Sequence, residues 1–236
     1  MGLKTSGAFG VYTGLFSTKK VIELLPLILV IGIALTPISA LAQKQPLANP
    51  MVEIKTEKGI ILVELYPDKA PISVDNFIKH VNDYHYDGLI FHRVINDFMI
   101  QSGGFTFDMT PRNSTRATII NESGNGLKNE RGTIAMARMS DPNSAQAQFF
   151  INHKNNAFLD AKDNNLGYTV FGKVASGMTT VDTIAKVKTT RLYSFADVPV
   201  EPIRILTTRL VNPNVWTAIE DRKTAASEFE RPIPLK

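Results

Sequence analysis

The chain has 236 residues, of which 44% are hydrophobic, and its 26 basic side chains slightly outnumber its 22 acidic ones. This composition favours a packed globular core and excludes an intrinsically disordered chain. The sequence contains no cysteine, which excludes disulfides, thiol nucleophiles, thiolate zinc sites and a lipid-modified cysteine, and which suits an oxidising compartment.

Residues 1–42 are predicted to be a signal peptide. Two lysines precede an apolar run over residues 24–35, and Ala40-Leu41-Ala42 has the small-x-small pattern of a cleavage site. A retained membrane anchor is the alternative, because residues 24–42 approach the length of a spanning helix, although two prolines interrupt them. Without this segment the chain carries a formal charge of only +2, and it has no basic run interleaved with aromatics. We therefore expect no nucleic-acid partner.

A polar spacer over residues 43–50 leads into the first predicted strands. Residues 52–56 and 60–66 have apolar side chains at alternate positions, and Glu57-Lys58-Gly59 joins the two runs. This pattern is typical of a β-hairpin.

A helix is predicted next, over residues 71–83. Pro71 suits the first turn of a helix, and the apolar residues that follow it lie at helical spacing, namely Val74, Phe77, Ile78 and Val81. One apolar stripe results, so this helix should cover a core.

The rest of the chain is dominated by short apolar segments between turn-forming residues. Five of them are predicted strands, over residues 89–95, 98–101, 133–137, 148–152 and 169–174. A second short helix is expected around residues 181–187 and a last strand over 203–211. Residues 213–236 are interpreted as a C-terminal tail, in which Trp216 falls in a candidate short helix. Eight strands and two helices predict a closed sheet with capped ends.

Two consecutive motifs indicate the chemistry. Phe91-His92-Arg93-Val94-Ile95 and the following Phe98-Met99-Ile100-Gln101-Ser102-Gly103-Gly104-Phe105 set one arginine and one glutamine among large apolar side chains. A permanent cation beside an apolar pocket suits a reaction on a neutral amide. Related segments follow at residues 132–138, 148–152, 158–159 and 168–174.

These segments, in this order over residues 51–211, resemble the cyclophilins, which are peptidyl-prolyl cis-trans isomerases. The resemblance is nearest to the exported bacterial form, since Gly104, Phe158 and Tyr168 stand where cytosolic eukaryotic members usually carry Asp, Trp and His. It implies a closed eight-stranded antiparallel β-barrel capped by two α-helices, formed by residues 51–212. Together with the signal peptide, it predicts a periplasmic or secreted protein, or a protein anchored in the inner membrane if the leader is retained.

Prolyl isomerisation needs no covalent step, metal or cofactor, so none is expected. A catalyst must bind the amide better when it is twisted than when it is planar, against a barrier of roughly 18 to 20 kcal/mol. Arg93 suits this role because it stays protonated and presents several donors in one plane.

The resemblance extends the site beyond Arg93. It implies catalytic roles for Gln101 and Phe98 and an apolar socket for the proline ring, with Phe158 and Tyr168 at its rim. Met99, Phe150 and Leu159 would line that socket, and Ala137, Arg138 and Gln148 would line a groove for the residues before the proline. A position in the protein core is the alternative for Met99 and Leu159.

The resemblance also implies partners. We expect proline-containing polypeptides as substrates, a monomer, and weak cyclosporin binding, because the tryptophan usual at position 158 donates a hydrogen bond to that inhibitor. A proline-segment-binding chaperone or adhesin with little turnover is the alternative function. The four histidines lack the spacing of a metal site, so no metal is expected.

Overall fold

The computed structural model of the protein describes residues 48–163 and 165–229, with side chains as far as Thr224. The predicted signal peptide, most of the spacer and the end of the tail lie outside these residues. Within the described ranges, no helix is both long and apolar enough to cross a membrane.

The first two strands form the predicted hairpin. β1 (Met51–Thr56) and β2 (Gly59–Leu65) pair antiparallel, from Met51 opposite Glu64 to Thr56 opposite Gly59. Alternate side chains are buried on one face, as the period-two pattern predicts.

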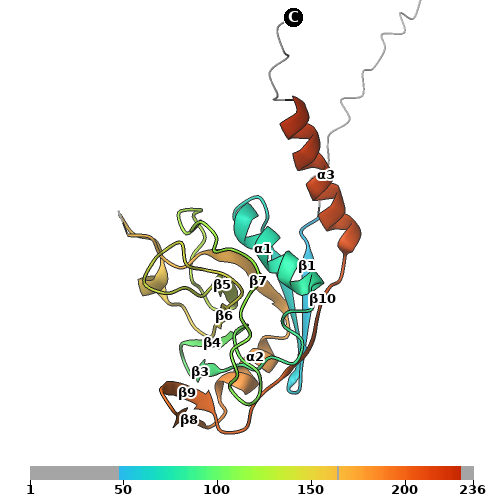
Figure 1. Cartoon of the computed structure of the whole chain (residues 1–236). Coiled ribbons are helices and arrows are strands. Elements are labelled where there is room, and N and C mark those ends of the chain that lie inside the picture. The colour runs from blue at the N-terminus through green and yellow to red at the C-terminus, as the bar shows by residue number, and fades with distance from the viewer. Residues whose placement is uncertain (1–47, 164, 230–236) are drawn as a thin grey trace, which may run out of the picture. The chain divides into compact units, whose positions relative to one another are not determined.

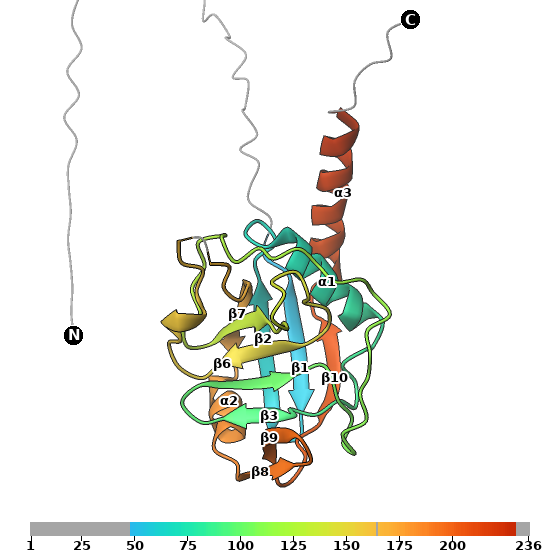
Figure 2. The ribbon, with the colours of Figure 1, turned by 60° about the vertical axis from the view of Figure 1, so that its left-hand side comes forward.

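One antiparallel sheet of eight strands carries the fold, in the order β10-β1-β2-β7-β5-β6-β4-β3 (Figures 1 and 2). The other six strands are β3 (Arg93–Ile95), β4 (Met99–Ser102), β5 (Thr133–Met136), β6 (Phe149–Asn152), β7 (Val170–Ser176) and β10 (Ile205–Leu210). The predicted class, mainly β with eight antiparallel strands, is confirmed.

The predicted closure of the sheet is overstated. Among the described strand pairs, the two end strands β3 and β10 form no ladder with each other. A bridge between Ile90 and Arg204 spans the seam, and three backbone hydrogen bonds of 2.7 to 3.0 Å join residues 88–91 to residues 203–205. β3 has only three residues, which leaves little strand to pair across the gap. The sheet is therefore curled into a half-barrel.

Two helices cover the ends of the curled sheet, as predicted. α1 (Pro71–Asn82) and α2 (Met178–Ala185) lie at opposite ends of it (Figure 1). Their apolar stripes enter the main core, where Phe77 and Ile184 are fully buried. Gly177, before α2, has φ 91, and a Cβ there would lie 2.2 Å from the carbonyl oxygen of Ile60. This close approach requires glycine.

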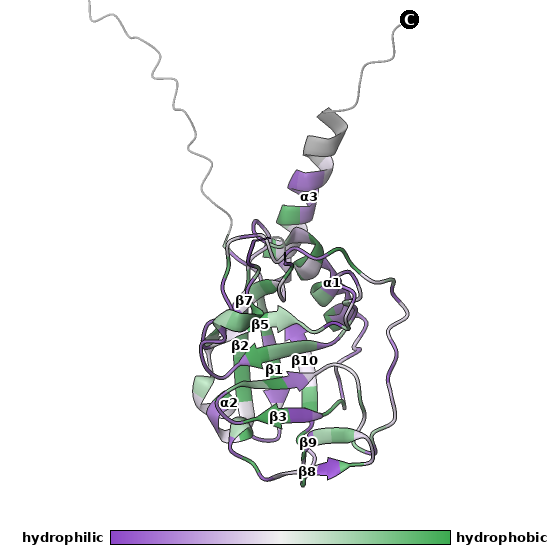
Figure 3. Cartoon of the chain, turned by 90° about the vertical axis from the view of Figure 1, so that its left-hand side faces the viewer, coloured by the Kyte–Doolittle hydropathy of each residue, from purple (hydrophilic) through white to green (hydrophobic). Residues whose placement is uncertain are grey.

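The sequence pattern does not predict a second, two-stranded sheet. β8 (Thr189–Leu192) and β9 (Phe195–Pro199) form it. β8 is exposed along its whole length, so it lacks the alternating burial that marks a strand, whereas β9 is mostly hydrophobic (Figure 3). The 3-10 helix η1 (Ala157–Leu159), which lies between two predicted strands, is also missed.

The C-terminal helix is longer than the candidate short helix. α3 (Pro213–Phe229) has 17 residues, and its later turns extend away from the sheet (Figure 1). Near its start, Trp216 is only 5% exposed and joins the main core. The beginning of this helix is thus packed against the domain.

Candidate active site

Five side chains from five strands form one row across a face of the sheet, which we call the outer row. Arg93 of β3 stands opposite Gln101 of β4, Gln101 opposite Phe150 of β6, Phe150 opposite Ala135 of β5, and Ala135 opposite Val170 of β7. Residues that directly oppose each other in antiparallel strands share a face. The adjacent row points the other way, into the main core, and consists of Val94, Ile100, Ile151 and Ile134.

A second apolar cluster, separate from the main core, surrounds the outer row, and we call it the outer cluster. Its buried members are Met99, Ala135, Phe150 and Val170, and the partly buried side chains packed against them are Ile95, Phe98, Leu127, Ala137, Leu159 and Tyr168. Met99 and Leu159 thus belong to this cluster and not to the main core. Six predicted site residues come together here.

Aromatic rings form the rim of the outer cluster. Phe158 is 75% exposed and stacks on Phe98, with ring centroids 5.5 Å apart and planes at 26°. Tyr168 meets the ring of Phe150 edge-on at 5.6 Å, and the guanidinium of Arg138 lies 4.5 Å from the centre of the Tyr168 ring. The rim thus offers flat apolar area beside a cation, which suits contact with varied peptide side chains.

Polar groups lie beside the outer cluster. The side-chain amide of Gln101 donates to Oε1 of Gln148 at 2.9 Å. Arg93 Nε lies 3.7 Å from Oδ2 of Asp197 in β9, and the two side chains are 43% and 39% exposed. The guanidinium is therefore open to solvent and to a ligand, while a carboxylate restrains it from one side.

A groove of about 220 Å³ begins at Gln101. Three further predicted residues line it, namely Ala137, Arg138 and Gln148. Gly104 also lines it, and a Cβ at that position would lie 2.5 Å from Nε2 of Gln148. The absence of a side chain at position 104 therefore leaves Gln148 room to reach Gln101.

His92 directly precedes Arg93, just before the start of β3. It is 5% exposed, and its Nδ1 has no hydrogen-bond partner among the described residues. Burial, with a smaller effect of the neighbouring Arg93 charge, lowers the pKa of His92 from 6.5 to about 4. The imidazole is therefore neutral near pH 7.

No metal centre is evident in the parts of the chain that the structure describes: no group of three His, Asp or Glu side chains there could hold an ion.

Sequence reasoning misses several members of the site. In the sequence, Ala135 and Val170 are indistinguishable from ordinary strand residues. Only the cross-strand register with Phe150 identifies them as site residues, and the sequence alone does not reveal that register. Asp197 lies in the unpredicted second sheet, more than a hundred residues beyond Arg93.

Comparison with known proteins agrees with this geometry. Residues 51–210 match the family model described as cyclophilin type peptidyl-prolyl cis-trans isomerase. A peptidyl-prolyl cis-trans isomerase of Acinetobacter baylyi is 51% identical over 168 residues, which are 71% of this chain and 89% of the relative. Peptidyl-prolyl cis-trans isomerase B of Escherichia coli is 48% identical over 158 residues, which are 66% of this chain and 96% of the relative.

Among solved structures, the chain is similar to a Cryptosporidium parvum cyclophilin type peptidyl-prolyl cis-trans isomerase crystallised in the presence of the dipeptide Ala-Pro. That match has a TM-score of 0.56 and 26% identity, and it covers 68% of this chain and 98% of the other.

Proposed function

This chain belongs to the family of cyclophilin-type peptidyl-prolyl cis-trans isomerases and is such an isomerase, and from that premise we propose that it speeds proline-limited folding of exported proteins. It does so by stabilising the twisted amide without a covalent intermediate. The observation that carries this mechanism is the outer row, in which a guanidinium and an amide stand in line with a buried phenylalanine.

The mechanism follows from the electronic structure of the amide. Twisting the X-Pro bond localises the lone pair on the prolyl nitrogen, which then becomes a hydrogen-bond acceptor. Arg93 donates to that nitrogen and so favours the twisted state over both planar forms. Gln101 holds the substrate carbonyl nearby. A million-fold acceleration would require about 8 kcal/mol of such preference.

The outer cluster receives the proline ring. Met99, Phe150 and Leu159 form its walls, while Phe98 and Tyr168 close it on two sides. A rigid socket holds the ring while the preceding residue rotates, so the binding energy is directed to the bond that turns.

The groove beside Gln101 receives the residues that precede the proline. Ala137, Arg138 and Gln148 line it next to Gly104, so a small or extended peptide segment fits there. Phe158 provides no indole N–H at the rim, and we expect weak cyclosporin binding for that reason.

The exported setting rests on the signal segment over residues 1–42 and on the lack of cysteine in the whole sequence. N-terminal sequencing of the protein recovered from the periplasmic, secreted and membrane fractions of its cells tests it. A chain that begins near Gln43 in a soluble exported fraction supports cleavage. A cytoplasmic full-length chain contradicts export.

The catalytic assignment is tested by turnover of a cis-prolyl peptide. Arg93→Ala should lower kcat/KM by at least about 100-fold, and Arg93→Lys should recover little, because a lysine lacks the planar set of donors. Arg222→Ala, an exposed change on α3, is the matched control and should keep full activity. Full activity of Arg93→Ala would refute the mechanism.

A second candidate function, gripping proline-containing clients with little turnover, is favoured by the exposed ring of Phe158 stacked on Phe98. It requires suppression of client aggregation that survives Arg93→Ala. A contribution of the tail is tested by truncation after Glu220 and not after Asn212, because the shorter chain would lose Trp216 from the core. If aggregation is suppressed only by variants that isomerise, this function is refuted.

A further inference from the structure

The turn between β3 and β4 carries Phe98 and is held from outside by the segment after β6. The backbone N–H of His153 and the side-chain amide of Asn156 both donate to the carbonyl oxygen of Phe98, each at 2.9 Å. Within the turn Asp97 has φ 54, a left-handed conformation that aspartate adopts more readily than most residues with a Cβ. These external contacts add to the hydrogen bond of the turn itself, in which the N–H of Phe98 donates to the carbonyl of Ile95 at 3.2 Å.

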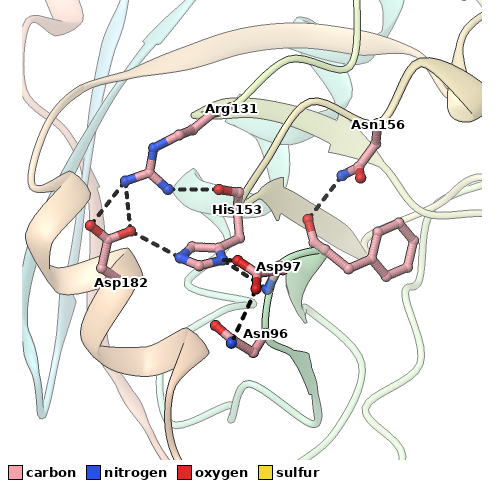
Figure 4. Close-up of polar contacts among 7 residues, drawn as sticks. Asn96, Asp97, Arg131, His153, Asn156 and Asp182 are labelled. Atoms are coloured by element: carbon pink, nitrogen blue, oxygen red, sulfur yellow. Dashed lines mark hydrogen bonds and ion pairs between the residues drawn. The ribbon is translucent and has the colours of Figure 1, made fainter.

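His153 makes the contact that reaches Asp97 itself. Its side chain is buried, and the backbone N–H of Asp97 donates to its Nδ1 at 3.0 Å. On the other edge of the ring, Nε2 lies 3.0 Å from Oδ1 of Asp182 in α2. Figure 4 shows the imidazole between the Asp182 carboxylate and the Asn96-Asp97 turn.

These two contacts select one form of the imidazole. A ring nitrogen that accepts from a backbone N–H carries no hydrogen, so Nδ1 is bare and Nε2 holds the hydrogen that it donates to Asp182. The imidazole of His153 thus accepts a hydrogen bond from the turn through Nδ1 and donates one to α2 through Nε2.

Arg131 fixes the far side of this arrangement. Its NH2 donates to both carboxylate oxygens of Asp182, at 2.7 and 2.9 Å, and its NH1 donates to the carbonyl of His153 at 2.6 Å (Figure 4). Burial raises the pKa of Asp182, but the hydrogen bond and charge of Arg131, with help from His153, outweigh it and lower the pKa. The carboxylate therefore stays ionised and keeps accepting from His153.

We propose that His153 is a positioning residue for the isomerisation: through the Asp97 N–H it fixes the turn that sets Phe98 in the outer cluster. β6 supplies Phe150 to the same cluster and leads directly into His153. One strand therefore provides a wall of the socket and the anchor for its neighbour. This inference rests on the proposed function, because it requires Phe98 to contact the substrate.

Two conservative substitutions separate the two edges of the ring. The amide oxygen of asparagine takes about the place of Nδ1, and the amide nitrogen of glutamine takes about the place of Nε2. His153→Asn therefore keeps the acceptor for the Asp97 N–H and loses the contact with Asp182, whereas His153→Gln does the reverse. Each variant loses one hydrogen bond, so both should be destabilised to a similar extent.

The two variants should differ in turnover of a cis-prolyl peptide. His153→Asn should stay within about twofold of the wild-type kcat/KM, while His153→Gln should lose at least about fivefold. Equal turnover of the two variants, or the reverse order, overturns the proposal, since a purely structural histidine predicts no such split. Phe98→Ala is measured alongside. If that variant keeps full activity, the proposed site is wrong, whereas a loss there with equal histidine variants defeats only the role of His153.

Hydrogen exchange provides a second measurement, independent of turnover. The Asp97 amide of the wild-type protein should exchange slowly, because it donates to a buried ring nitrogen. It should remain protected in His153→Asn and lose protection in His153→Gln. An unprotected Asp97 amide in the wild-type protein overturns the proposal.

Discussion

Replacing His92 with glutamine should remove much of the acid sensitivity of this fold. The imidazole is buried and its Nδ1 has no hydrogen-bond partner among the described residues, so the folded protein resists protonating it. Its pKa is lowered to about 4 from the ordinary 6.5. A glutamine at this position has no charge to acquire.

The sign and size of this pH effect on the free energy of unfolding follow from the folded and unfolded pKa values of His92. Between about pH 6.5 and about pH 4 the unfolded chain binds a proton at His92 that the folded chain does not bind, so the free energy of unfolding falls as pH falls. Each pH unit in this window lowers the free energy of unfolding by about 1.4 kcal/mol, so acidification to about pH 4 lowers it by about 3 kcal/mol in total. That decrease is a large share of the free energy of unfolding of a typical domain, which is roughly 5 to 15 kcal/mol.

The assay is urea unfolding of both proteins at about pH 7 and about pH 4. Burial also lowers the pKa of His80 and His85, so the wild-type protein should lose more than the contribution of His92 alone. The difference between the two proteins isolates His92, and the variant should lose about 3 kcal/mol less. Equal losses, within about 0.5 kcal/mol, would refute the reasoning, as would an imidazole that titrates near its ordinary value by NMR.

Three further outcomes are expected. Trp216→Ala should lower the free energy of unfolding by about 3 to 5 kcal/mol in a urea titration, because it empties a core position. A loss below about 1 kcal/mol would show that α3 is not anchored there. Gly177→Ala should cost at least about 2 kcal/mol, seen as a lower Tm by circular dichroism, because its methyl would meet the carbonyl of Ile60. An unchanged Tm contradicts that geometry. Asp197→Asn should lower kcat/KM about threefold with little change in stability, because a half-exposed ion pair orients Arg93 more than it stabilises the fold. Unchanged kcat/KM would exclude that orienting role.

Local patterns in the sequence predict most of this fold because its strands are short apolar runs between turn-forming residues and because burial alternates in its first hairpin. The hairpin of β1 and β2 and the stripe of α1 emerge from such spacing. Closure of the sheet does not, since it depends on how far β3 extends and on what meets it across the seam. β8 is not predicted because all of its side chains are exposed.

The sequence also predicts only part of the candidate site. Arg93, Gln101 and the aromatic residues are identified through their motifs, and the structure gathers most of them in the outer row and the outer cluster. Ala135 joins them only through cross-strand register. His153 and Asp197 act through contacts between distant segments, and spacing along the chain contains no trace of such contacts.

The incomplete closure of the sheet between β3 and β10 has a consequence for the order in which the protein loses activity and unfolds. Arg93 sits on the terminal strand of the sheet, which is three residues long and pairs within that sheet with β4 alone. Terminal strands fray before central ones, so mild stress should loosen this edge while the interior remains intact. We therefore expect isomerase activity to be lost under milder stress than global unfolding requires, because the strand that loosens first carries Arg93, the proposed donor to the prolyl nitrogen.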